Sequence, residues 1–559
     1  MKKTMRVIIL ALAFLCSAPV AGTNDPNLRL VVQITVDQLR GDIPARFAHR
    51  FVEGEPGGFR YLLEHGLVFA NAHFAHATTF TALGHATLVT GGYTAQHGIA
   101  GNDWYDPVRG KRVYAVEDPD ASVLRKQHGI HEGSSPRNLT STTLGDELVS
   151  ASGGQSRVFA VSGKNRAAIL TGGHLGKAFW YWKDTGEFVT SDFYYDEYPA
   201  WVAKWNAARP ANRFRNTRWQ LIDDPASYLF LGQDDRPFER SYKSLGRTFP
   251  HVLNHEEPAA FYSQLRFTPM QDELVLEFAE ALVRGEQLGT GEYPDYLSLS
   301  FSATDLIGHA FGPNSLEAED NILRLDRTLA RLFAFLDQQV GLDKTLVVLS
   351  SDHGICAAPE YSSSKGFDAG RLDPPALVAD LNARLRRNFD IDIDLVAAFY
   401  NPSLYLDLAA LARTGLPTAD VERALVNELR AVPGIAMAIS RTDLLRGAVP
   451  SDPIGQRVLR AFHPRRTGHV VIVQEQLWYL HTVRDTYTAM HGSPYSYDTF
   501  VPIMFAGPGV PAGKVHRAVG PEDIAPTLAA YLGIQPPSGS MGRVLTEVLQ
   551  TPETAGDNR

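Results

Sequence analysis

Acidic and imidazole side chains follow apolar runs in this sequence, at points where they could bind a metal ion. The apolar run Leu346–Leu349 is typical of a strand buried on both faces, and Asp352 and His353 come directly after it. Two further apolar runs lead to Asp37 and Asp305. One such acid is usually a helix cap, but three of them, all following strands, favour a metal site.

Histidines extend this set of candidate ligands. Asp305 and His309 are four residues apart, so on a helix they would share one face. A further histidine, His491, lies where the chain is expected to return to the core after the second insertion. The candidate ligands are Asp37, Asp305, His309, Asp352, His353 and His491. Oxygen and nitrogen donors without thiolates suit zinc, with manganese as an alternative.

Six ligands are too many for one tetrahedral zinc with an open position, so we predict two ions. Paired ions about 3.5–4 Å apart stabilise the attacking and leaving oxygens of an in-line displacement, most often at phosphorus. The pattern therefore indicates phosphoryl transfer.

Three threonines precede a stretch that can form a helix ended by Gly91. A threonine at a helix N-terminus is usually a cap, but the helix dipole there also stabilises an alkoxide or a phosphate. Spacing alone leaves Thr78, Thr79 and Thr81 open as candidate nucleophiles.

Two cations lie in a loop and could approach the same anion. Lys164 and Arg166 follow the predicted strand 157–161, and a solvated loop is the alternative. Asn102 lies in a segment rich in Asn and Asp, which taken alone predicts an ordinary turn.

The order of elements predicts an α/β fold, with a central, mostly parallel sheet flanked by helices on both faces and with inserted cap segments. Leucines and isoleucines spaced three and four apart predict a core helix over 316–336. We interpret residues 23–559 as a single catalytic domain with insertions at about 181–267 and 374–484. The first insertion is expected near the mouth of the site, outside the sheet.

The N-terminus has the pattern of a secretory signal over residues 1–22. Lys2, Lys3 and Arg6 precede the apolar run Val7–Leu15, which is too short to span a membrane. The bulky Leu15 argues against lipid attachment at Cys16. These features predict a periplasmic or secreted protein without stable membrane association.

Net charge and cysteine content argue against a nucleic-acid-binding protein and against a disulfide-stabilised one. Cleavage near residue 22 would reduce the 53 basic residues to 50 against 62 acidic ones, a net charge of −12. Nothing in this composition favours a nucleic-acid-binding surface. Cys356 would be the only remaining cysteine, which excludes an intramolecular disulfide, and we interpret it as a small buried residue.

Together these motifs resemble the alkaline phosphatase superfamily, and within it the PafA-type bacterial alkaline phosphatases. The matching segments occur in the family order and cover nearly the whole mature chain. They are the strand ending in Asp37, Thr81 with Gly84-His85, Gly101–Asp106, Lys164-Asn165-Arg166, Asp305–His309, Ser351–Gly354 and His491–Ser493.

The resemblance implies two zinc ions and a role for each residue. Asp305, His309 and His491 would hold one ion. Asp37, Asp352 and His353 would hold the other, with Thr81 as its further ligand and as the nucleophile. Asn102, Lys164 and Arg166 would contact the phosphoryl oxygens. The sequence departs from the family at Ala82-Leu83, where a Gly-Pro pair is common.

The expected function is zinc-dependent hydrolysis of small phosphate monoesters through a phosphothreonine. The alternative within the superfamily is a nucleotide pyrophosphatase/phosphodiesterase or a phosphonate-hydrolysing relative, which the pair Lys164 and Arg166 disfavours because a monoester dianion carries more charge. Arylsulfatases need a cysteine or serine that the threonine segment lacks. A catalytically silent zinc-binding protein is the alternative from another class.

Overall fold

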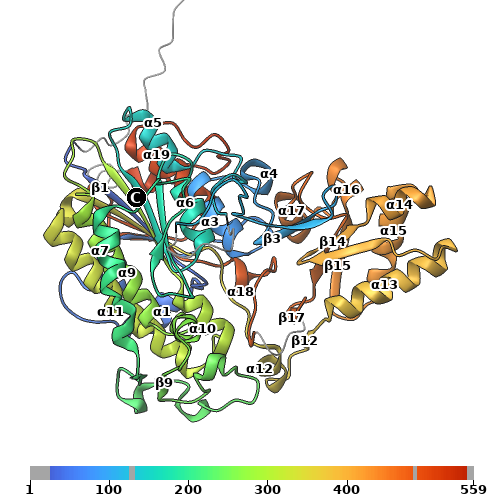
Figure 1. The fold of residues 1–559 in the computed structure, drawn as a ribbon, viewed down its shortest axis with the longest axis horizontal. Helices are drawn as coiled ribbons and strands as arrows, with labels where there is room; N and C mark the ends of the chain where they lie inside the picture. The colour runs from blue at the N-terminus through green and yellow to red at the C-terminus, as the bar shows by residue number, and fades with distance from the viewer. Residues whose placement is uncertain (1–25, 125–132, 482–486, 550–559) are drawn as a thin grey trace, which may run out of the picture.

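A nine-stranded mixed sheet forms the centre of the computed structural model, which describes residues 26–124, 133–481 and 487–549 (Figure 1). The strands in sheet order are β19 (Gly513–Val515), β2 (Leu67–Phe69), β18 (Ile503–Ala506), β11 (Thr345–Ser350), β1 (Leu30–Val36), β10 (Asp295–Phe301), β5 (Val158–Ser162), β6 (Lys177–Tyr181) and β7 (Phe188–Val189).

Helices cover both faces of this sheet because its central strands are apolar on both sides. In β1, Val32 and Ile34 pack into the core beneath one helical layer, whereas Val31 faces the other. The first layer contains α2 (Phe59–His65), α9 (Met270–Gly285), α10 (Ala303–Phe311) and α11 (Leu316–Gln339). The opposite layer contains α3 (Thr81–Thr90), α5 (Leu144–Ala151), α6 (Asn165–Gly172) and α19 (Ile524–Leu532). The predicted α/β architecture is confirmed.

Five neighbouring strands, β11, β1, β10, β5 and β6, run parallel, so their carboxyl ends meet at one edge. Asp37 follows β1, Lys164 follows β5, Asp305 follows β10, and Asp352 follows β11. The topology therefore places these four side chains at the edge where open α/β sheets bind ligands.

The aromatic segment after residue 181 begins inside the sheet, contrary to our expectation. Tyr181 is the last residue of β6, and Phe188–Val189 pairs antiparallel with it as β7. Tyr181 and Phe188 pack into the core here, and the weak periodicity of the segment concealed this short strand. The chain then leaves the sheet through α7 (Ala200–Ala208) and the short ribbon formed by β8 (Thr217–Trp219) and β9 (His251–Leu253).

The second predicted insertion contains a smaller sheet with its own helices and apolar core, set to the right in Figure 1. Its strands in sheet order are β13 (Val396–Tyr400), β14 (Ser403–Leu406), β16 (Val470–Gln474) and β15 (Ile435–Ser440). Its helices are α13 (Pro374–Phe389), α14 (Leu408–Thr414), α15 (Thr418–Leu429), α16 (Arg441–Arg446) and α17 (Pro453–Arg460). The division into one catalytic domain with two insertions stays a prediction.

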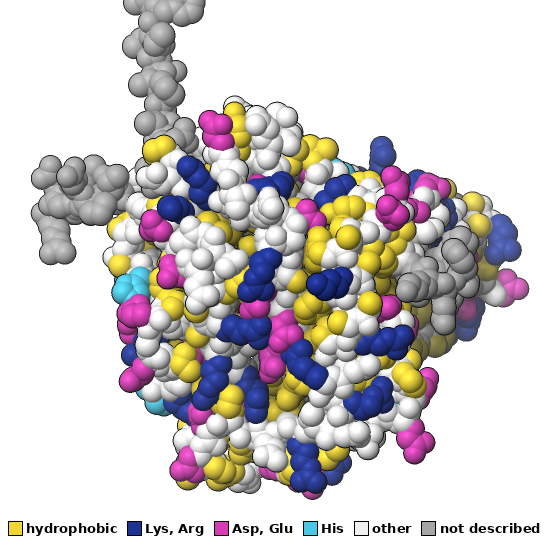
Figure 2. Space-filling model, turned by 60° about the vertical axis from the view of Figure 1, so that its left-hand side comes forward, with side chains coloured by type: hydrophobic (Ala, Val, Ile, Leu, Met, Phe, Trp, Pro, Cys, Tyr) yellow, Lys and Arg dark blue, Asp and Glu magenta, His cyan; other side chains and the backbone are white. Residues whose placement is uncertain are grey.

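The predicted signal segment 1–22 and Cys16 lie outside the described residues. In the part of the chain that the structure covers, no helix is both long and apolar enough to cross a membrane. On the face shown in Figure 2, acidic and basic side chains are interspersed with apolar ones.

Candidate active site

Two groups of buried ligand atoms lie at the carboxyl edge of the sheet. Asp305, His309 and His491 form one group, and Asp37, Asp305 and His353 form the other, each with its ligand atoms within 4.8 Å of one another. Asp305 belongs to both, so two bound ions would be neighbours. Sequence reasoning had assigned Asp305 to one ion only.

Asp352 lies beside the second group, as the sequence predicted. Its Oδ2 is 3.4 Å from His353 Nε2, and the same nitrogen is 3.6 Å from Asp37 Oδ1. On the other side of the site, His309 Nε2 is 3.1 Å from Asp305 Oδ1. The helical spacing of four in α10 therefore brings Asp305 and His309 together as expected.

The three histidines present the same nitrogen to the site. Nδ1 of His309 lies 2.7 Å from the Ala489 carbonyl oxygen. Nδ1 of His491 is 2.7 Å from the Thr79 carbonyl, and that of His353 is 2.9 Å from the Gly354 carbonyl. Because a carbonyl only accepts, each Nδ1 carries the proton, and Nε2 keeps its lone pair for a cation.

Burial and neighbouring charges shift the pKa values of the site's acids and histidines in different directions. Burial raises the pKa of Asp37 well above its usual range, and the charges of Asp305 and Asp352 add to this. Burial also opposes ionisation of Asp305, but neighbouring His309 and Lys164 hold its pKa well below the usual range. Burial lowers the pKa values of His353 and His491, which favours the neutral, metal-binding imidazole.

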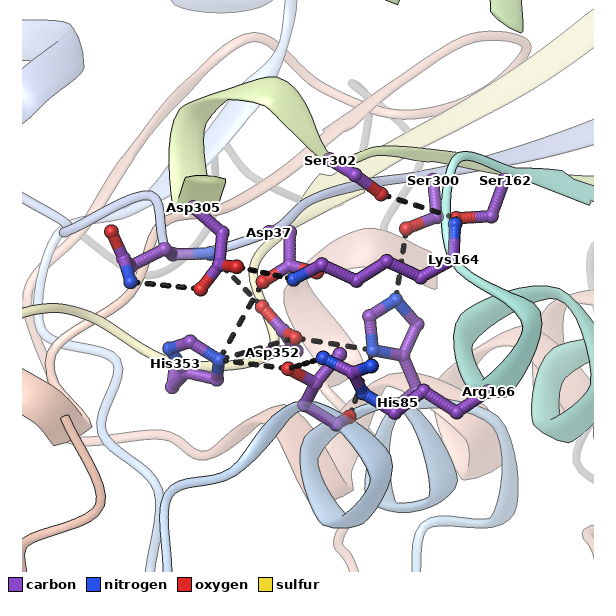
Figure 3. A network of polar contacts seen from close by, with 12 residues as sticks. Asp37, His85, Ser162, Lys164, Arg166, Ser300, Ser302, Asp305, Asp352 and His353 are labelled. Carbon is purple, nitrogen blue, oxygen red and sulfur yellow. Dashed lines mark hydrogen bonds and ion pairs between the residues drawn. The ribbon is translucent and has the colours of Figure 1, made fainter. Parts of the chain in front are cut away.

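Lys164 reaches into the centre of the acidic cluster, as Figure 3 shows. Its Nζ donates to Asp37 Oδ2 at 2.6 Å and to Asp305 Oδ2 at 2.5 Å, and its side chain is only 2% exposed. The lysine therefore belongs to the site and not to a solvated loop.

Thr81 is the threonine whose hydroxyl faces this cluster. It is the first residue of α3, and its Oγ1 lies 3.1 Å from Arg166 Nη2 and 3.5 Å from His353 Nε2. Thr79 instead donates its hydroxyl to the Ser493 carbonyl, and among the described residues no hydrogen bond joins the Thr78 hydroxyl to a candidate ligand. Asn102 supports this helix end, because its Oδ1 accepts from the Ala82 amide at 2.9 Å.

Gly84 allows α3 to lie against the strand end that carries Asp352. A Cβ atom on Gly84 would lie 2.1 Å from the Asp352 carbonyl oxygen. We therefore expect Gly84→Ala to lower the free energy of unfolding by about 1–3 kcal/mol and to reduce activity, because α3 must move away. Thermal unfolding measures this against Gly232→Ala, whose Cβ meets no atom within 4 Å. Unchanged stability and activity in Gly84→Ala would contradict the close packing.

Gln38 is a site residue that sequence reasoning missed. It directly follows Asp37 in a left-handed conformation (φ 73°), its side chain donates to Asp305 Oδ1 at 2.8 Å, and its backbone N–H donates to Asp352 Oδ1 at 3.1 Å. A Cβ on Gly308 would lie 2.1 Å from Gln38 Oε1. The glycine before His309 was the available signal, because it makes room for this glutamine.

His85, which the sequence singled out only as part of a motif, orients two of these groups. Its Nδ1 lies 2.9 Å from the Thr81 carbonyl and 3.2 Å from Asp352 Oδ2, and its Nε2 lies 2.9 Å from Ser300 Oγ (Figure 3). It thereby ties the start of α3 to the end of β11.

The site has the chemistry of a divalent-cation site. Asp37 Oδ1 is buried and receives no hydrogen bond within the described residues. Such an oxygen is costly unless a cation binds it. Carboxylates and neutral imidazoles without thiolates suit zinc. Cys356 is buried, burial raises the pKa of its thiol, and it belongs to neither ligand group.

Comparisons with known proteins identify the family of this chain. The family model for type I phosphodiesterase/nucleotide pyrophosphatase matches residues 31–494. Alkaline phosphatase PafA from Elizabethkingia meningoseptica is 35% identical over 526 residues, which is 94% of this chain and 95% of that protein. Alkaline phosphatase PhoV from Synechococcus elongatus is 34% identical over 525 residues, 93% of each chain.

The solved structure of wild-type PafA has the same fold, with a TM-score of 0.86 and 34% identity over 93% of this chain and 99% of that one. A second PafA structure carries substitutions of a threonine, an asparagine, a lysine and an arginine. Those four residues are separated by the same intervals as Thr81, Asn102, Lys164 and Arg166.

Proposed function

Because this chain belongs to the type I phosphodiesterase/nucleotide pyrophosphatase family of the alkaline phosphatase superfamily, we propose that it hydrolyses phosphate monoesters with two zinc ions and Thr81 as nucleophile. The chain is an enzyme of the alkaline phosphatase type, as its similarity to PafA and PhoV indicates. The predicted signal segment adds the proposal that it works in the periplasm or outside the cell.

One observation carries the proposal: the hydroxyl of Thr81 shares one buried site with Arg166 and with both ligand groups. A nucleophile, a cation for the phosphoryl oxygens and a metal-ligand set are the parts that phosphoryl transfer requires. Matching spacing of the four substituted PafA residues supports the same assignment for Thr81, Asn102, Lys164 and Arg166.

We assign the ions to two ligand sets. His309 and His491 would hold one ion and Asp37, Asp352 and His353 the other, and the position of Asp305 lets its carboxylate serve both. When bound, the two ions would supply Lewis-acid stabilisation of the attacking and leaving oxygens.

The chain's own groups then act as follows. Thr81 Oγ1 forms a bond to phosphorus while the bond from phosphorus to the ester oxygen breaks, and the alcohol leaves with a proton. Water then attacks the phosphothreonine, which releases phosphate and restores the hydroxyl. The Arg166 guanidinium can bind two phosphoryl oxygens, and Lys164 and Asn102 add a compact charge and an amide donor.

The central test compares an aryl phosphate monoester with the matching methyl diester on zinc-loaded protein. We expect the monoester to be preferred by orders of magnitude and a chelator to abolish turnover. A preference for the diester would instead support the phosphodiesterase alternative. Failure to turn over either ester with zinc bound would support a silent zinc-binding protein.

Arg166 is expected to set the monoester preference, because a monoester presents more negative charge than a diester. We expect Arg166→Ala to lower kcat/KM for the monoester by about 10²-fold or more and for the diester by a clearly smaller factor. The ratio of the two values measures the effect. Equal losses on both esters would show that Arg166 does not discriminate between them.

A further inference from the structure

A cavity of about 270 Å³ adjoins the residues assigned to the phosphoryl group. Lys164 and Arg166 form part of its wall, so a molecule reacting at Thr81 could extend into it. We call it the basic pocket. The residues that define it here are Tyr114, Lys164, Arg166, Trp180, Trp182 and Arg266.

Arg266 is the feature of this pocket that the proposed chemistry does not use. It follows α8 (Pro258–Leu265) and is partly buried. Within the described residues, its guanidinium has neither a hydrogen bond nor an ion pair with a carboxylate, and burial together with the charge of Arg166 lowers its pKa. A partly buried guanidinium without a counter-charge is costly, so this position favours a bound anion.

The remaining wall is aromatic and suits an organic body. Trp180 and Trp182 come from the end of β6 and the residue after it, and Tyr114 OH donates to Asn165 Oδ1 at 2.7 Å. The pocket thus combines aromatic rings and a second arginine.

We propose that the basic pocket binds the second phosphoryl group of a bisphosphorylated small molecule while the first phosphoryl group reacts at Thr81. The inference rests on the proposed phosphatase function and names its preferred substrate class. Arg266 would bind phosphate oxygens as a fork, in the way that guanidinium groups recognise such anions.

The test uses short alkanediols of increasing length, each as a monophosphate and as a bisphosphate, with the full-length zinc-loaded protein. We expect kcat/KM for the best bisphosphate to exceed that of its monophosphate by about tenfold or more, mainly through KM. Arg266→Gln should reduce this ratio to about two, the statistical factor for a molecule with two phosphoryl groups. The variant should lower kcat/KM for the monophosphate less than for the bisphosphate. Arg266→Lys should keep part of the preference.

Arg218→Ala is the matched control, because it removes one exposed arginine charge outside the pocket. It should keep the full preference, and thermal unfolding checks that each variant is folded. The inference is overturned if the wild-type protein shows no preference at any length, or if Arg266→Gln lowers both rates equally. No turnover of any monoester would instead overturn the proposed function itself.

Discussion

Thr81→Ala is expected to lower kcat for phosphate monoesters by roughly 10³-fold or more, because it removes the atom that would bond to phosphorus. The residual rate would reflect the cations and ligand groups around the lost hydroxyl. Since Thr81 would contribute only one oxygen beside the proposed three carboxylates and three imidazoles, the variant should still bind zinc. Steady-state kinetics and metal analysis on the same sample measure the two effects.

Thr81→Ser and Thr79→Ala are the controls for this result. Serine keeps the hydroxyl, so Thr81→Ser should retain substantial turnover. Thr79→Ala removes a hydroxyl that donates to the Ser493 carbonyl, so its cost should be to stability more than to chemistry. If Thr79→Ala abolished turnover and Thr81→Ala did not, the nucleophile assignment would be wrong. Trapping of labelled phosphate on the chain at low pH would locate the intermediate directly.

The placement of the acids could be predicted from the sequence for a topological reason. Parallel strands bring their carboxyl ends to one edge, so an acid after each apolar run must lie near the others, as Asp37, Asp305 and Asp352 do. His309 follows from helical spacing. His491 is distant along the chain, so its residue type made it a candidate ligand, but only the resemblance assigned it to the same ion as Asp305 and His309.

Features set by three-dimensional contact were not predictable in the same way. Gln38 has no motif of its own, and its role depends on the space left by Gly308. Arg266 lies in an aromatic segment of weak periodicity, so nothing in its spacing connects it with Arg166. The sharing of Asp305 between two ligand groups likewise depends on carboxylate orientation, which residue types and spacing do not determine.

Asp305→Asn provides the strongest test of the two-metal arrangement, because Asp305 is the acid common to both ligand groups. The amide keeps the size of the side chain but removes its negative charge. Asp37 does not replace that charge readily, because burial raises its pKa. We expect zinc content to fall well below two ions per chain and kcat/KM to fall by about 10³-fold or more.

Asp326→Asn distinguishes this effect from the general cost of altering a buried acid. Asp326 is also buried, but it accepts hydrogen bonds from the backbone amides of Val52 and Phe59, away from the ligand groups. The Asp326→Asn protein should be less stable than the wild type but should keep its zinc. If Asp305→Asn kept both ions and near-normal turnover, Asp305 would not hold metal. Loss of one ion only would assign its carboxylate to a single position, because a shared ligand must weaken both.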